Sequence, residues 1–216
     1  MKLNKPLNFE DIEETYIAFI KQNFILIKKL INESQKDSTP YDPVNKTIFL
    51  KGRSKHLQTM SLIGLTSENL TKLIVSKRGY VLNKIFFIKS FTKEKLEKIV
   101  YESRLIEFRK AVELFNKSNP PNYYSLIKSY VMNPYPDIYD KYSYFNRKII
   151  EPNKCLDLLI EVRNSYLHFA NPHSEQNGII WYLFNFLIWL TKKEFPEEFK
   201  KFNFIGSKES KKLFKK

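Results

Sequence analysis

The sequence is poor in cysteine, histidine and glycine. Its 216 residues include one cysteine, three histidines and five glycines. The single Cys155 excludes an intramolecular disulfide framework, and with so few histidines we expect no metal site and no cofactor. The low glycine content, beside frequent Leu, Ile, Phe and Lys, favours helices over a turn-rich β architecture. A reducing cytoplasm fits this cysteine usage best.

Long apolar runs are also missing. Residues 1–6 lack the apolar core of a signal peptide. The longest apolar stretch, residues 179–190, is interrupted by Asn185 and is too short to span a bilayer. We therefore expect no membrane segment. We expect instead a single helical domain over residues 1–200, followed by a basic tail over residues 201–216 that is a candidate for disorder.

Acidic residues are the minority among the charges. Lys and Arg number 37 against 23 Asp and Glu, which gives a formal net charge of +14. Such a charge attracts polyanions over a long range, so RNA is the expected partner. The alternative is a solvated lysine surface without a ligand.

Five segments carry apolar residues at helical spacing, and together they predict an all-α fold. Asn8 is the expected N-cap of the first helix, and Gly79 closes the second. Gly64, inside the second, permits another helix to approach closely. Thr92 is the expected cap of the third. The predicted helices span residues 12–31, 55–77, 92–116, 153–169 and 179–193.

Two segments leave alternatives open. Residues 81–91 fit either a short strand or a buried helical turn. Residues 119–150 are rich in proline and tyrosine and indicate an insertion, in which residues 123–132 fit a short helix. Tyr123 and Tyr124 of this insertion either stack on unpaired RNA bases or cover a core or subunit edge.

A polar cluster ends the helix predicted over residues 153–169. Asn164 and His168 are four residues apart and share a face. Arg163 is five residues from His168, about 7.5 Å along the axis, and its long side chain reaches toward the imidazole. Pro172 disfavours helical geometry just beyond this point. A cation beside a titratable imidazole suits phosphodiester chemistry.

This cluster resembles the Arg-x4-6-His signature of the HEPN superfamily, here residues 163–168 with Asn164 as the polar residue after the arginine. The resemblance implies a four-helix up-and-down bundle with additional helices and the Tyr/Pro-rich insertion. It also implies a metal-independent endoribonuclease, which acts as a homodimer with a composite site. A toxin or anti-phage role, and an antitoxin or defence-system partner protein, are implied in the same way.

The resemblance gives each residue of the cluster a role. His168 acts as general base or acid on the ribose 2′-OH or the leaving 5′-oxygen. Arg163 clamps the scissile phosphate, Asn164 positions the phosphate or the ring, and Glu161 supports Arg163. Attack by the 2′-OH leaves a 2′,3′-cyclic phosphate, so DNA binds without being cut.

Other basic residues and other functions remain open. Arg53, Lys55 and His56 stand at the start of the second predicted helix, where they either hold an RNA phosphate or form an exposed basic helix end. Arg163 and His168 are alternatively a salt-linked arginine and a helix-terminal histidine. The chain would then be a non-catalytic HEPN-like module that binds RNA or a protein, or a helical protein that binds nucleic acid by charge alone.

Overall fold

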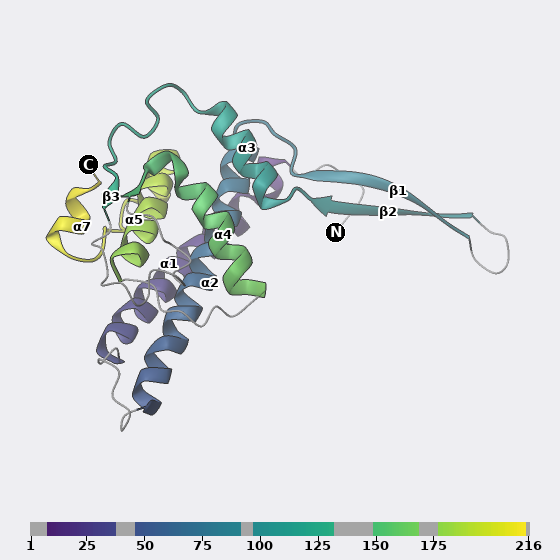
Figure 1. Cartoon of the computed structure of the whole chain (residues 1–216). Coiled ribbons are helices and arrows are strands. Elements are labelled where there is room, and N and C mark those ends of the chain that lie inside the picture. The colour runs from purple at the N-terminus through teal and green to yellow at the C-terminus, as the bar shows by residue number, and fades with distance from the viewer. Residues whose placement is uncertain (1–7, 38–45, 92–96, 132–148, 169–176, 215–216) are drawn as a thin grey trace.

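The computed structural model describes residues 8–37, 46–91, 97–131, 149–168 and 177–214. Helices make up most of this part of the chain, which confirms the predicted helical class in its coarse form (Figure 1). No helix within these ranges is both long and apolar enough to cross a membrane. The elements are α1 (Phe9–Asp37), α2 (Lys46–Lys77), β1 (Asn83–Phe91), β2 (Glu97–Leu105), α3 (Phe108–Ser118), β3 (Tyr130–Val131), β4 (Ile149–Ile150), the 3-10 turn η1 (Pro152–Lys154), α4 (Cys155–His168), α5 (Asn177–Glu194), α6 (Pro196–Phe199) and α7 (Lys208–Lys212).

The first helix begins where the sequence predicts. The Asn8 side chain accepts a hydrogen bond from the Asp11 amide at 3.1 Å, and the Asp11 carboxylate accepts one from the Asn8 amide at 3.0 Å. This reciprocal cap satisfies amides that a helix N-terminus leaves without partners. The predicted cap at Asn8 is confirmed.

The second helix is the centre of the fold, because α1, α3, α4 and α5 all contact it. It starts at Lys46 rather than near Lys55, so the predicted start is wrong by more than two turns. It ends as predicted, with Gly79 in the left-handed region at φ 86°. Its buried hydroxyls bond to carbonyls of the preceding turn, as Thr66 does to Leu62 at 2.6 Å. These local bonds let a helix rich in Ser and Thr be buried on several sides.

The helix predicted over residues 92–116 is wrong. Strands β1 and β2 pair in antiparallel register from Asn83 opposite Leu105 to Phe91 opposite Glu97. Together they form a ribbon that projects from the helical body (Figure 1). Only α3 at the end of the predicted segment is helical. The β-forming residues Ile99, Val100 and Tyr101 favour a strand in this stretch, and Thr92 lies outside the described residues.

The insertion over residues 119–150 contains no helix in its described part. Residues 121–126 form turns, and the short strand β3 pairs with β4. The predicted helix over residues 123–132 is therefore wrong. The tyrosines at positions 135, 139, 142 and 144 lie outside the described residues.

The C-terminal segment packs on the body instead of forming a disordered tail. Phe199 and Phe214 are buried, and the amide of Lys128 donates a hydrogen bond to the Leu213 carbonyl at 2.8 Å. Asn185, which interrupts the apolar α5, is fully buried and bonds both backbone groups of Ile205, at 2.9 and 2.8 Å. The rest of α5 from residue 179 to 191 is buried within this one chain apart from the half-buried Trp181. Its apolar face therefore needs no second copy to cover it.

Candidate functional site at the crossing of two helices

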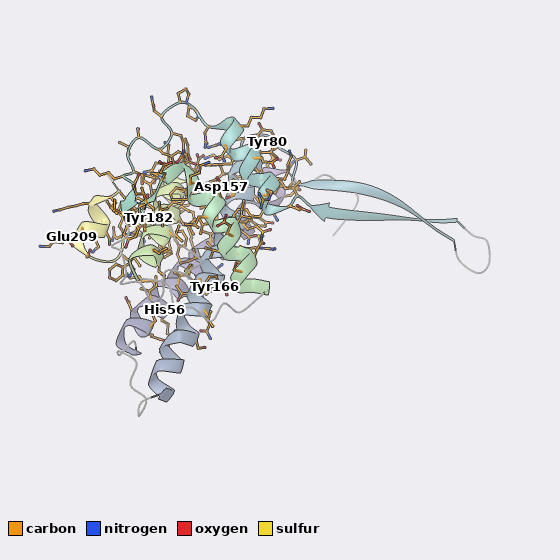
Figure 2. The ribbon with its side chains drawn as sticks, viewed as in Figure 1. His56, Tyr80, Asp157, Tyr166, Tyr182 and Glu209 are labelled. Carbon is orange, nitrogen blue, oxygen red and sulfur yellow. The ribbon has the colours of Figure 1, made fainter. Side chains whose placement is uncertain are left out.

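The α4 helix meets α2 at Gly64. A Cβ atom on Gly64 would lie 2.7 Å from the Cα atom of Arg163, closer than real Cβ atoms approach. Glycine is therefore needed for the two backbones to pass here. Further along, the Ser61 hydroxyl donates a hydrogen bond to the carbonyl of Tyr166 at 3.2 Å, near the end of α4 (Figure 2). The predicted close approach at Gly64 is confirmed, and Arg163 is the residue whose backbone lies against Gly64.

A buried carboxylate on α2 fixes the Arg163 side chain. Glu68 is one helical turn beyond Gly64, and its Oε2 atom accepts a hydrogen bond from Arg163 Nε at 2.9 Å. Its Oε1 atom accepts one from the buried Lys72, four residues further along the same helix, at 2.7 Å. Two cations around one carboxylate leave this crossing with a net positive charge.

The first helix also reaches this carboxylate. Burial raises the pKa of the Tyr16 hydroxyl, and the negative charge of Glu68 raises it further. Nearby, the buried Asn23 donates to the Thr66 hydroxyl at 3.0 Å and links α1 to α2. Side chains from α1, α2 and α4 therefore converge on one site.

The polar residues after Arg163 lie on the last turns of α4. Asn164 is exposed, and its Oδ1 atom accepts a hydrogen bond from Arg163 Nη1 at 3.2 Å. Glu161 is half-buried, but the carboxylate in contact with Arg163 Nε is Glu68 from another helix. His168 is the last residue of α4, and its side chain lies outside the described part. The approach of the imidazole to Arg163 stays a prediction.

The basic residues of the predicted helix start lie elsewhere than expected. Since α2 begins at Lys46, Arg53, Lys55 and His56 stand in its third turn, where no helix-terminal amides point outward. Lys55 lies 3.4 Å from the carboxylate of Glu33, and His56 is buried at 9% exposure. The prediction that these residues stand at a helix start is therefore wrong, whereas their contact with an RNA phosphate stays a prediction. The side chain of Arg53 lies outside the described residues.

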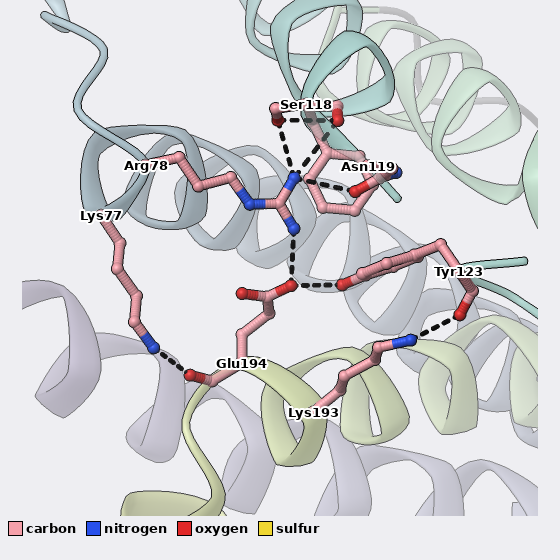
Figure 3. Close-up of polar contacts among 8 residues, drawn as sticks. Lys77, Arg78, Ser118, Asn119, Tyr123, Lys193 and Glu194 are labelled. Atoms are coloured by element: carbon pink, nitrogen blue, oxygen red, sulfur yellow. Dashed lines mark hydrogen bonds and ion pairs between the residues drawn. The ribbon is translucent and has the colours of Figure 1, made fainter. Parts of the chain in front are cut away.

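A second polar cluster joins the ends of α2, α3 and α5 (Figure 3). The Glu194 carboxylate accepts hydrogen bonds from Arg78 Nη2, at 2.6 Å, and from the Tyr123 hydroxyl. Arg78 Nη1 donates to Ser118 and Asn119, at 2.7 and 2.8 Å. The Arg78 guanidinium carbon also lies 4.7 Å from the centre of the Phe115 ring. These contacts use the guanidinium group on its edges and its face.

Tyr123 and Tyr124 pack inward. Tyr123 is 5% exposed, and its ring meets Trp189 edge to face with centroids 5.7 Å apart. The Tyr124 ring stacks on Phe186 at 6.2 Å. Burial, together with the hydrogen bond to Glu194, raises the pKa of Tyr123. The structure thus favours the alternative in which these tyrosines cover the core.

The sequence analysis did not predict the contact of Glu68 with Arg163. The available signal was its spacing: a residue four positions after Gly64 shares the helix face on which Gly64 admits a neighbour. In the part of the chain that the structure covers, His, Cys, Asp and Glu nowhere gather in threes suited to a metal ion.

The chain was compared with the models of known protein families, with curated protein sequences and with solved structures. None of the three comparisons finds a match.

Proposed function

We propose that this protein is a metal-independent endoribonuclease whose site is built on Arg163 and His168. The observation that carries the proposal is that the Arg163 side chain is held in place and still meets solvent. Its guanidinium group is fixed by Glu68 and bonded to Asn164, yet its side chain keeps 29% of its surface exposed. A cation held in place before the substrate arrives stabilises charge on phosphate oxygens without reorganisation.

The chemistry follows from an arginine and an imidazole at the end of one helix. His168 takes the proton of the ribose 2′-OH, and the resulting oxygen attacks the adjacent phosphorus. The 5′-oxygen leaves and receives a proton, which gives a 2′,3′-cyclic phosphate end. Arg163 bonds the non-bridging oxygens as negative charge builds up on them.

The proposal includes a homodimer in which both copies contribute to one cleft, and a role as a toxin or anti-phage effector with a partner protein. Because α5 is covered within one chain, the dimer would form on another face. Arg163 lies on the surface formed by α2 and α4, which suits such a cleft.

RNA cleavage in EDTA tests the proposal. We expect the wild type to cut a pool of single-stranded and structured RNA and to leave cyclic phosphate ends. His168→Ala and Arg163→Ala should lose about 10²-fold or more of this activity. Arg109→Ala removes an exposed arginine on α3 and serves as the matched control, with unchanged cleavage.

The fold of each variant is checked by circular dichroism and urea unfolding, since Arg163→Ala leaves Glu68 with one cation fewer. Intact RNA at high concentrations of the wild type contradicts the proposal. Cleavage that survives in His168→Ala contradicts it as well.

The second candidate function is a non-catalytic helical module that binds RNA or a protein. The same ion pair favours it, because an arginine bonded to a buried carboxylate also fits a purely structural role. RNA that the wild type retains but never cuts would support this candidate.

A further inference from the structure

A groove lies on the side of the molecule formed by α1, α5 and the segment after α6. Its volume is about 520 Å³, within the range of small-molecule sites. The fully buried Phe24 of α1 and Phe184 of α5 lie beneath it, and the half-buried Phe202 and Ile205 of the C-terminal segment line it as well. The Arg163 site lies instead between α2 and α4, so the groove is a separate feature.

The floor and one wall of the groove are firmly built. Phe24 packs edge to face with Phe184 and with Phe202, at centroid distances of 5.2 and 5.4 Å. The buried Asn185 bonds both the amide and the carbonyl of Ile205, which fixes the wall that the C-terminal segment forms. At the edge, Ile25 keeps 58% of its surface exposed although it is fully apolar. The groove therefore offers apolar surface that the chain itself leaves uncovered.

The rim of the groove is cationic. Lys28 and Lys201 are exposed, and no carboxylate among the described residues pairs with either. Lys29 lies 3.9 Å from Glu33, but Glu33 also lies 3.4 Å from Lys55, so a single acid serves two lysines. A ligand with an anionic group is favoured at this rim.

Two carboxamides complete the rim. Asn32 and Asn203 line the groove from opposite walls, both are exposed, and neither bonds to another described residue. A carboxamide offers both donors and an acceptor, which match the edge of a nucleobase. A plain acyl chain would leave these groups unused.

We propose that this groove binds a nucleoside phosphate. The base lies on Phe202 and Ile205 and against Ile25, the amides of Asn32 and Asn203 bond its edge, and Lys28 and Lys201 hold the phosphate. The source is either a free mononucleotide or an unpaired nucleotide of an RNA strand. This binding goes beyond the proposed cleavage, because it needs neither Arg163 nor His168.

Binding is measured in the His168→Ala background with EDTA present, so that cleavage does not interfere. AMP is titrated by calorimetry, and a fluorescein-labelled single-stranded RNA of about ten nucleotides is titrated by anisotropy. We expect Lys28→Glu combined with Lys201→Glu to weaken binding of AMP, of the RNA or of both by about tenfold or more. Lys117→Glu combined with Lys211→Glu changes two exposed lysines elsewhere by the same total charge, and should alter binding less than twofold.

The AMP titration and the RNA titration together identify the source of the nucleotide. Loss for AMP alone indicates a free mononucleotide, and loss that includes the RNA indicates a strand. Equal loss in both double variants overturns the proposal, since binding would then depend on net charge alone. If inorganic phosphate or dodecyl phosphate displaces AMP as effectively as a second nucleotide does, the proposal is also overturned, because the base would then contribute nothing to binding. The absence of saturable binding by both probes overturns it too, whether or not the wild type cuts RNA.

Discussion

Arg78 binds the half-buried Glu194 and Arg163 binds the buried Glu68, but the protein uses the two guanidinium groups differently. Arg78 meets Glu194, Ser118 and Asn119 with its nitrogens, and its face lies on the Phe115 ring. Its side chain is 17% exposed. Arg163 is held by Glu68 at Nε and by an exposed asparagine, and its side chain is 29% exposed.

The difference separates a structural ion pair from a site that keeps contact with solvent. Around Arg78 both terminal nitrogens donate to the protein's own acceptors, so these contacts join the ends of three helices. Around Arg163 the ion pair sets the direction of the guanidinium group at the surface. Under the proposed function, Arg163 is the arginine that a substrate can reach, because its fixed charge still meets solvent.

The largest effect on stability is expected from Arg78→Ala. Removal of the cation leaves the Glu194 carboxylate, which is 12% exposed, without its ionic partner. We expect the free energy of unfolding to fall by about 3–5 kcal/mol. Urea unfolding at pH 7 measures it, with Arg109→Ala on the exposed surface of α3 as the control at about 0.5 kcal/mol or less. A loss no greater than that of the control would show that Glu194 finds other partners.

Gly64→Ala tests how the position of the Arg163 backbone affects stability and cleavage. The added methyl group would meet the Cα atom of Arg163 at 2.7 Å, so α2 and α4 must separate. We expect a loss of about 1–3 kcal/mol in unfolding free energy, together with weaker RNA cleavage. Gly79→Ala is the matched control, because no atom beyond its two chain neighbours lies within 4 Å of its added methyl group, and strain comes from its φ of 86°. Stability lost in Gly64→Ala without any change in cleavage would separate the crossing from the site.

Local signals predicted much of this fold. The cap at Asn8, the end of α2 before Gly79 and the spans of α4 and α5 follow from residue types and spacing within a few positions. Each of these features depends on neighbours in sequence. The predicted start of α2 is wrong because glycine usually disfavours a helix interior, whereas Gly52 lies inside this helix.

Features that depend on distant pairing were harder to predict. The apolar positions of residues 97–105 fit helical and strand spacing alike, and only pairing with β1 decides between them. The pairing of Glu68 with Arg163 joins residues 95 positions apart and needs the register of α2 against α4. Gly64 revealed that a helix passes there, but not which residue of that helix meets it.

The smallest expected effect is the difference between Tyr123 and Tyr16 in how each changes the free energy of unfolding at alkaline pH. Burial and Glu194 raise the pKa of Tyr123, while burial and Glu68 raise that of Tyr16. The unfolded chain loses these protons near pH 10 and the folded chain keeps them, so stability is unaffected below pH 10 and falls above it. Each fully retained proton removes about 1.4 kcal/mol per pH unit in that range.

Tyr123→Phe should therefore flatten the fall in unfolding free energy between about pH 10 and 11, measured by urea unfolding at steps of pH. Tyr16→Phe should flatten it less, because this half-buried ring lies near its glutamate, whereas Tyr123 also donates a hydrogen bond to Glu194. At pH 8 the Tyr123→Phe protein should already be less stable by about 1 kcal/mol, since Glu194 loses a donor. Equal slopes for the two variants would show that the Glu68 site excludes water as fully as the Glu194 cluster does, which would count against a site open to RNA.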